Sequence, residues 1–133
     1  MQKTYENPAS APRPIGPYSQ VVRVETGDTA LLYISGQVAV DLAGNLVGAG
    51  DTAAQTDQVY QNLAAILAAN GATFDDVVKM NTYLVNIADR AASGAVRARY
   101  LTGNLPASTL VAVAALAQPE YLIEVEAIAA VQR

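Results

Sequence analysis

The pattern of apolar and polar positions in the first third of the chain predicts a β-hairpin. Val21–Glu25 and Leu31–Ser35 are short runs rich in apolar residues, and Thr26–Asp28 between them has the composition of a turn. Gly36 interrupts the second run, so we expect Val38–Val40 to continue as a short strand after a bulge. The chain is therefore expected to begin as part of a β-sheet.

A long amphipathic helix is predicted over residues 52–69. Thr52–Gln55 has the spacing of a capping box, and the Asn70-Gly71 pair is typical of a helix end. The apolar side chains recur at helical spacing and share one face: Val59, Leu63, Ile66 and Leu67. This face is expected to pack on the sheet.

The second half of the chain returns to strand patterns. Residues 77–86 are β-branched and alternating, which predicts a strand, and residues 89–100 predict a second helix. Two last strands are predicted at residues 108–116 and 122–131, with residues 118–120 as the turn of a second hairpin.

The order of these elements, β-β-(β)-α-β-α-β-β, predicts the fold class. Residues 7–20 and 41–50 contain Pro, Gly or Asn at short intervals and are expected to be loops. Strands and helices interleave, but the first and last strand pairs are hairpins. We therefore predict one α+β domain over residues 1–133, a mixed sheet with two helices packed on one face. The other face would lack helices, and its apolar residues would need cover.

The composition supports self-association. Hydrophobic residues make up 52% of the chain and charged residues 15%, whereas an average soluble domain is roughly 25% charged. A monomer of 13.9 kDa exposes roughly 6,700 Å². Eight basic and twelve acidic side chains cover that area sparsely. We therefore expect apolar surface to be buried between copies of the chain.

The residue types that are missing exclude several classes of chemistry. Without cysteine there is no disulfide, and without histidine there is no Ser-His-Asp catalysis and no His-containing zinc site, so we expect no metal and no cofactor. The chain has no long apolar run and no apolar core of a signal peptide, which predicts a cytoplasmic protein without a membrane segment. The net charge of −4 and the scattered basic residues argue against nucleic-acid binding.

The glycine-rich segment Gly44–Thr52 precedes the long helix and raises the question of a phosphate loop. A Walker-type loop needs Lys before the Ser or Thr, and here that position is Asp51. A carboxylate there would repel phosphate. A simple connecting loop is the favoured interpretation.

Glu124 and Glu126 are the strongest candidates for acid/base chemistry. Residues two apart in a strand leave the same face, so the two side chains form a carboxylate pair. Apolar residues flank them on both sides, and a carboxylate in such surroundings tends to be hydrogen-bonded or functional. The alternative is a solvent-facing strand.

Other polar candidates each have a structural alternative. Tyr18 follows the rigid Gly16-Pro17 turn and either packs in the loop or contacts a ligand. Gly36, next to Ser35, permits a close approach to the backbone or only forms a bulge. Ser108 begins a strand or offers a hydroxyl donor to a ligand, although no general base adjoins it in sequence.

Together these segments resemble the RidA/YjgF family, also called the endoribonuclease L-PSP family. No single segment is specific, but the set runs in order through nearly the whole chain. The resembling stretches are Ala11–Gln20, Tyr33–Gln37, Gln55–Leu63, Asp76–Lys79, Pro106-Ala107 and Ile123–Ala129.

The resemblance implies a homotrimer of chorismate-mutase-like subunits with three ligand clefts between neighbours. It also implies hydrolysis of reactive enamines and imines to ketoacids and ammonia, without a cofactor. In that assignment Glu124 orients the attacking water, Tyr18 lines the cleft, and Ser35 and Gly36 belong to a substrate-binding segment.

The sequence departs from the family where an arginine normally follows Pro-Ala and clamps the substrate carboxylate. Here that residue is Ser108, and the family's common Asn in the second helix falls at Gly94. A charge-assisted hydrogen bond contributes roughly 1.5–3 kcal/mol, so a carboxylate would bind worse by roughly one to two orders of magnitude. Arg97 or Arg99 is a possible substitute for the missing arginine.

The predicted second hairpin adds a geometric constraint. With its turn near residue 119, Glu124 would face Ala112, and Ser108 would lie about 13 Å further along. One hairpin cannot place Glu124 and Ser108 on one small ligand. A site that joins them would therefore need two subunits.

We predict a RidA-like trimer that binds a small metabolite in its clefts; as an enzyme it would hydrolyse a C=N bond at Glu124. The first alternative is a non-catalytic ligand-binding or sensing trimer, which Ser108 would suit. The second is an RNase or translation inhibitor, which the acidic charge balance and the lack of histidine oppose.

Overall fold

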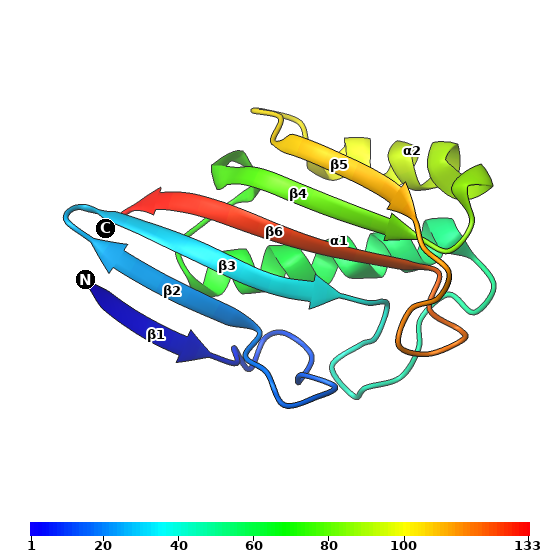
Figure 1. The fold of residues 1–133 in the computed structure, drawn as a ribbon, viewed down its shortest axis with the longest axis horizontal. Helices are drawn as coiled ribbons and strands as arrows, with labels where there is room; N and C mark the ends of the chain where they lie inside the picture. The colour runs from blue at the N-terminus through cyan, green and yellow to red at the C-terminus, as the bar shows by residue number, and fades with distance from the viewer.

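The computed structural model describes residues 1–133 and contains one six-stranded sheet and two α-helices (Figure 1). The helices are α1 (Thr52–Ala69) and α2 (Arg90–Tyr100); short 3-10 turns precede β4 (Phe74–Asp76) and α2 (Ile87–Asp89). The strands are β1 (Gln2–Glu6), β2 (Val21–Thr26), β3 (Thr29–Gln37), β4 (Val77–Leu84), β5 (Ala107–Ala112) and β6 (Ile123–Gln132). The predicted α+β class is confirmed.

The strand order β1-β2-β3-β6-β4-β5 confirms the first predicted hairpin and shows that the second is wrong. β5 and β6 do not pair, because β4 lies between them; β4 pairs antiparallel with β6 and parallel with β5. β6 is buried on alternate residues along its whole length, whereas β5 is almost wholly exposed. The more apolar strand therefore takes the central position, and β5 takes an edge.

Two short segments differ from the prediction. β1 has a polar sequence and was not predicted; it forms the other edge of the sheet by pairing with β2. Val38–Val40 does not continue β3, although the register of β3 does shift between Ile34 and Gln37, as a bulge requires. The carbonyls of this segment are bound by a side chain instead of a strand: Asn62 Nδ2 donates to Val38 O at 3.2 Å and to Val40 O at 3.0 Å.

Helix α1 has the predicted bounds but a different cap. Asp51 is the N-cap, and its carboxylate accepts a hydrogen bond from Ala54 N at 3.1 Å. Thr52 lies inside the helix and donates its hydroxyl to Asp89 at 2.7 Å, so the predicted capping box is wrong. Gln55 instead contacts the segment before β6, donating to Glu120 O and accepting from Leu122 N, both at 2.9 Å. The Asp51 carboxylate thus caps the N-terminus of α1, in agreement with the prediction that residues 44–52 are a connecting loop and not a phosphate loop.

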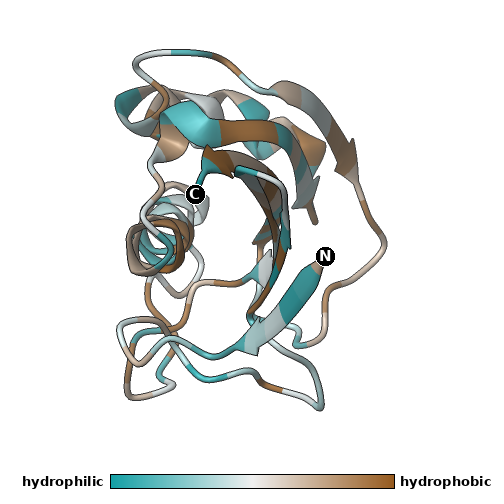
Figure 2. Ribbon diagram, turned by 90° about the vertical axis from the view of Figure 1, so that its left-hand side faces the viewer, coloured by the Kyte–Doolittle hydropathy of each residue, from teal (hydrophilic) through white to brown (hydrophobic).

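The core lies between the helices and one face of the sheet. Figure 2 shows both helices on the same side of the curved sheet. The residues of β6 that point toward the helices are between 0 and 9% exposed: Ile123, Val125, Ala127, Ala129 and Val131. The predicted apolar face of α1, Val59, Leu63, Ile66 and Leu67, is buried against them. Burial of this set is the main source of stability.

The opposite face of the sheet has no helix over it. The intervening residues of β6, which are Glu124, Glu126, Ile128 and Ala130, are only half-buried. Tyr33 of β3 is 45% exposed on this open face. No helix of the protein has the length and apolarity needed to cross a membrane.

Candidate functional site

A pocket of about 470 Å³ opens where the loop before β2 meets the ends of β3 and β6. It lies on the open face of the sheet, at the end that carries Glu124. Its lining residues are Ile15, Gly16, Pro17, Tyr18, Ser35, Gly36, Ala117 and Glu124. The structure therefore brings together four of the residues singled out from the sequence, Tyr18, Ser35, Gly36 and Glu124.

Two lining residues, Ile15 and Ala117, were not singled out as site residues from the sequence, although Ile15 lies within the resembling stretch Ala11–Gln20. Both are apolar and lie in loops, so neither periodicity nor chemistry marks them. Ala117 reaches the pocket because the loop that leads into β6 ends beside β3, whereas Ile15 is brought there by its own loop, in which its N–H donates to the Tyr18 hydroxyl. No group of three or more acidic side chains is arranged to hold a metal ion.

Gly36 is the floor on which the Glu124 carboxylate rests. A Cβ built on Gly36 would lie 2.7 Å from Glu124 Oε2 and 2.8 Å from its Cδ, closer than real Cβ atoms approach. The bulge in β3 turns this backbone position toward Glu124. Both interpretations of Gly36 therefore apply: it lies in a bulge, and it permits the close approach of Glu124.

A buried amide pair anchors the pocket loop to β3. Gln37 Nε2 donates to Gln20 Oε1 at 2.8 Å and to Ser35 O at 3.0 Å, and Gln20 in turn donates to Pro12 O. Both glutamine side chains are 3% exposed. Because buried amides are costly to leave unpaired, this network fixes the loop against the strand.

The Ser35 hydroxyl belongs to the same anchoring system. Its Oγ donates to Ser19 O at 2.6 Å. Its single proton is thus committed to the loop, and only its lone pairs remain for a ligand. Ser35 lines the pocket, but its hydroxyl proton holds the loop that carries Tyr18 and Ser19 and is not available to a ligand.

Tyr18 forms the rim of the pocket. Its side chain is 42% exposed, and its hydroxyl accepts a hydrogen bond from Ile15 N at 3.2 Å. The ring lies over Gly16, where a Cβ would be 3.3 Å from Tyr18 Cε2. The aromatic ring is therefore folded onto its own loop, where it lines the pocket.

Glu124 and Glu126 share the open face but have different surroundings. Glu126 Oε1 accepts hydrogen bonds from the Tyr83 hydroxyl and from Asn81 Nδ2, the latter at 3.3 Å. Glu124 accepts no hydrogen bond from the protein. Partial burial, together with the charge of Glu126, raises the pKa of the Glu124 carboxyl above its usual value. Glu124 is thus the carboxyl that is free to meet a ligand.

Ser108 does not reach this pocket. It lies on β5, where it pairs with Met80 of β4, and Met80 points toward the helices. Paired residues of parallel strands leave the sheet on the same face, so Ser108 points away from the face that carries Glu124. The predicted pairing of Glu124 with Ala112 is wrong, because Glu124 pairs with Tyr83. Ser108 and Glu124 of one chain are therefore apart, as predicted, but the reason is different: their strands are separated by β4 and their side chains point to opposite faces of the sheet.

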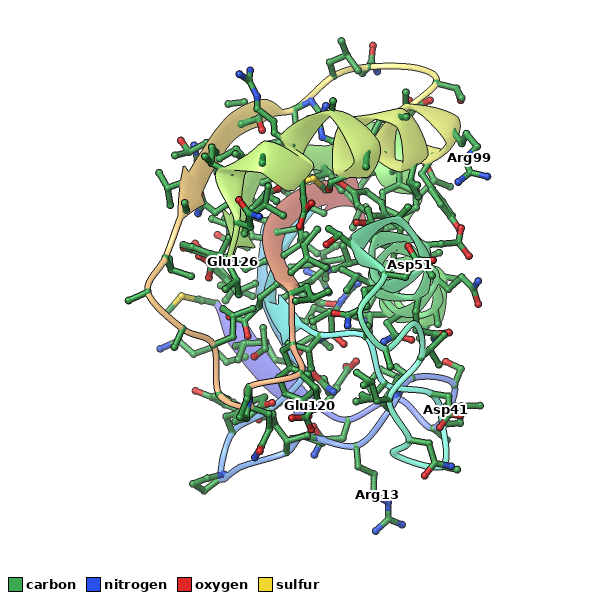
Figure 3. All side chains as sticks on the ribbon, turned by 90° about the vertical axis from the view of Figure 1, so that its right-hand side faces the viewer. Arg13, Asp41, Asp51, Arg99, Glu120 and Glu126 are labelled. Carbon is green, nitrogen blue, oxygen red and sulfur yellow. The ribbon has the colours of Figure 1, made fainter.

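The two candidate substitutes for the missing arginine are also distant from Glu124. Arg97 of α2 lies beside Tyr60 of α1, and Arg99 is exposed at the helix end. Figure 3 shows Arg99 on the helix side of the molecule and Glu126 on the opposite side of the sheet. Neither arginine contributes to the pocket of its own chain.

Comparison with known proteins identifies the family. The family described as "Endoribonuclease L-PSP" matches residues 8–131. The chain belongs to the endoribonuclease L-PSP family. This is the RidA/YjgF family that the sequence segments resemble.

Several L-PSP relatives cover nearly the whole chain. Protein DfrA of Myxococcus xanthus is 41% identical over 119 residues, 90% of this chain and 88% of that protein. The human 2-iminobutanoate/2-iminopropanoate deaminase is 37% identical over 121 residues, 91% of this chain and 85% of that protein. The crystal structure of the yeast protein YEO7 superposes with a TM-score of 0.89 at 36% identity, over 99% of this chain and all of the other.

Proposed function

We propose that this L-PSP protein hydrolyses the C=N bond of a small imine, or of the enamine from which the imine forms. One observation carries the proposal: the Glu124 carboxyl lies over Gly36 in an open pocket and accepts no hydrogen bond from the protein. The similarity to proteins named 2-iminobutanoate/2-iminopropanoate deaminase supports this choice of reaction.

The pocket offers what this reaction needs. Water adds to the imine carbon as a proton reaches nitrogen, and the resulting amino alcohol expels ammonia to leave a carbonyl group. An enamine first moves a proton from nitrogen to carbon and then reacts as the imine. Glu124 accepts a hydrogen bond from the attacking water and, with its pKa raised, can also hold the proton in transit. Tyr18 and Pro17 confine the substrate beside it.

We propose a homotrimer as the working form. The open face of the sheet carries exposed or half-buried apolar side chains, among them Tyr33 and Ile128. Packing this face against neighbouring copies would remove that apolar surface from water. Ser108 is exposed on the edge strand β5 and points to the other face of its own sheet, so it would join a Glu124 only if the edge of β5 in one subunit borders the pocket of the next.

Ser108 in place of the family's arginine bears on the substrate. A neutral hydroxyl replaces a two-pronged charged donor, so the clamp on a carboxylate is weaker. We therefore expect poor activity on 2-imino acids and better activity on imines without a carboxylate. A trimer that binds such a ligand without turning it over is the alternative that this residue favours.

The proposal is tested by generating 2-iminopropanoate in situ with an amino-acid oxidase and following its decay. We expect micromolar protein to accelerate the decay, Glu124→Gln to lose at least about tenfold of that acceleration, and Ser108→Arg to increase it. No acceleration by either the natural protein or Ser108→Arg, on this imine and on a carboxylate-free one, would contradict the deaminase proposal. Light scattering tests the trimer, with an expected mass three times the 13.9 kDa of the chain.

A further inference from the structure

The charged side chains on the open face of the sheet are equal in number but unpaired. The strands present two ammonium groups there, Lys3 and Lys79, and two carboxylates, Glu124 and Glu126. None of the four takes part in either of the two ion pairs that the protein forms within its chain. Such a face can meet a second copy of itself with opposite charges in contact.

Lys79 and Glu126 are the two charges that assembly through this face would take out of water. Both are already half-buried, and together with Tyr33 they line a hollow of about 280 Å³. Lys3, in contrast, is exposed on the edge strand β1, and Glu124 belongs to the pocket that a substrate must enter. A charge that becomes buried is costly unless an opposite charge and hydrogen bonds meet it.

Within one chain Lys79 and Glu126 bind different neighbours. Lys79 Nζ donates to Thr109 Oγ1 of β5 at 2.9 Å, and its other two protons have no acceptor in the protein. Glu126 accepts from the Tyr83 hydroxyl and from Asn81 Nδ2, both at Oε1, so Oε2 receives no donor. Each group therefore keeps the hydrogen-bonding capacity that the other would satisfy.

We infer that Lys79 of one subunit forms an ion pair with Glu126 of the next, three times around the trimer. The inference rests on the homotrimer of the proposed function and names the contact that sets its register. A contact between two different sites on identical chains repeats head to tail and can close into a ring. The apolar side chains of the open face, among them Tyr33 and Ile128, supply the stability, and the ion pair selects one arrangement of them.

The same pair brings a second chain to the Glu124 pocket. Glu126 lies two residues from Glu124 on one face of β6, about 7 Å along the strand. Lys79 is bonded to Thr109 on the edge strand β5. Joining Lys79 to Glu126 of the next subunit therefore places the β5 edge of the first subunit near the pocket of the next. Ser108 precedes Thr109 on that edge, so this is the arrangement in which it can take part in the site.

The experiment reverses one charge in each of two differently tagged chains. In Lys79→Glu two carboxylates would face each other at every junction of a trimer, and in Glu126→Lys two ammonium groups would. We expect light scattering at micromolar concentration to show each variant alone with the mass of one chain. An equimolar mixture should recover the mass of three chains, because two of the three junctions in a mixed trimer join opposite charges. Capture through one tag should then recover the other.

Matched controls reverse a charge away from the open face. Arg99→Glu on the exposed side of α2 and Asp28→Lys in the β2–β3 turn should both remain trimers. Far-ultraviolet circular dichroism checks that each variant is folded. If Lys79→Glu or Glu126→Lys does not fold alone, the two are refolded together, and the same mixed trimer is expected.

A single chain with both reversals distinguishes this inference from an ion pair formed within one chain. A pair within the chain predicts that Lys79→Glu/Glu126→Lys restores the trimer whereas the mixture does not; the inference expects both to restore it. A natural protein that is not a trimer, single variants that stay trimeric, or a mixture that recovers no trimer would each overturn the inference. Only the first of these outcomes also contradicts the proposed trimer, and the hydrolysis assay tests the proposed reaction independently.

Discussion

The two faces of strand β6 show how one segment serves two purposes. The residues that point toward the helices are apolar and buried, and they form the centre of the core. The residues between them include Glu124 and Glu126, half-buried on a face that no helix covers. Alternation along a strand thus separates the residues that stabilise the fold from those available for chemistry. Changes on one face should therefore be distinguishable from changes on the other.

The largest effect is expected on the covered face. Ile123 is fully buried, and Ile123→Ala removes three carbon atoms from the core. We expect the free energy of unfolding to fall by about 2–5 kcal/mol, because the cavity adds to the lost burial. Urea unfolding followed by circular dichroism measures it. Val111→Ala, on the exposed edge strand β5, is the control, and an equal loss in both variants would contradict the distinction between the faces.

On the open face the critical contact is that between Gly36 and Glu124. In Gly36→Ala the new methyl group would overlap the carboxylate, so the Glu124 side chain must move. We expect turnover to fall by roughly tenfold or more, since a displaced general base loses its alignment with the water.

A double-mutant cycle on stability tests whether the overlap between the new methyl group and Glu124 is the cause. If the cost comes from the contact, Gly36→Ala should destabilise the natural protein but have little effect in a Glu124→Ala background. The coupling would then be about 0.5–3 kcal/mol by thermal unfolding. Equal costs in both backgrounds would instead attribute the effect to strain in the β3 bulge.

The sequence predicted those features that depend on neighbouring residues. The bounds of α1, the β2–β3 hairpin and the facing of Glu124 and Glu126 all follow from local periodicity. The strand order did not, because nothing local indicates that β6 inserts between β3 and β4. β1 was missed for a related reason: its polar sequence becomes a strand only by pairing with β2.

The candidate site divides in the same way. Tyr18, Ser35, Gly36 and Glu124 were identified from motifs and meet in one pocket. The role of the Ser35 hydroxyl was not predicted, because its acceptor, Ser19 O, lies across the loop–strand contact. Ser108 was placed through a hairpin that does not exist, so its true facing became visible only with the β4–β5 pairing.

The smallest effect concerns the energetic cost of keeping Glu124 on the open face. Its pKa is raised by burial and by Glu126 above the usual value of 4.5, so the folded state holds this proton to higher pH than the unfolded state does. Below the unfolded value both states are protonated and there is no cost. As the pH rises past the folded value, the fold loses stability.

Glu124→Gln should therefore be slightly more stable than the natural protein at neutral pH, by less than about 1 kcal/mol, because the carboxyl keeps part of its hydration. The gain should disappear in acid. Melting temperatures across the pH range measure it, with Glu6→Gln as the control. A Glu124→Gln variant that is less stable than the natural protein at neutral pH would show that the ionised carboxylate stabilises the folded state and does not destabilise it.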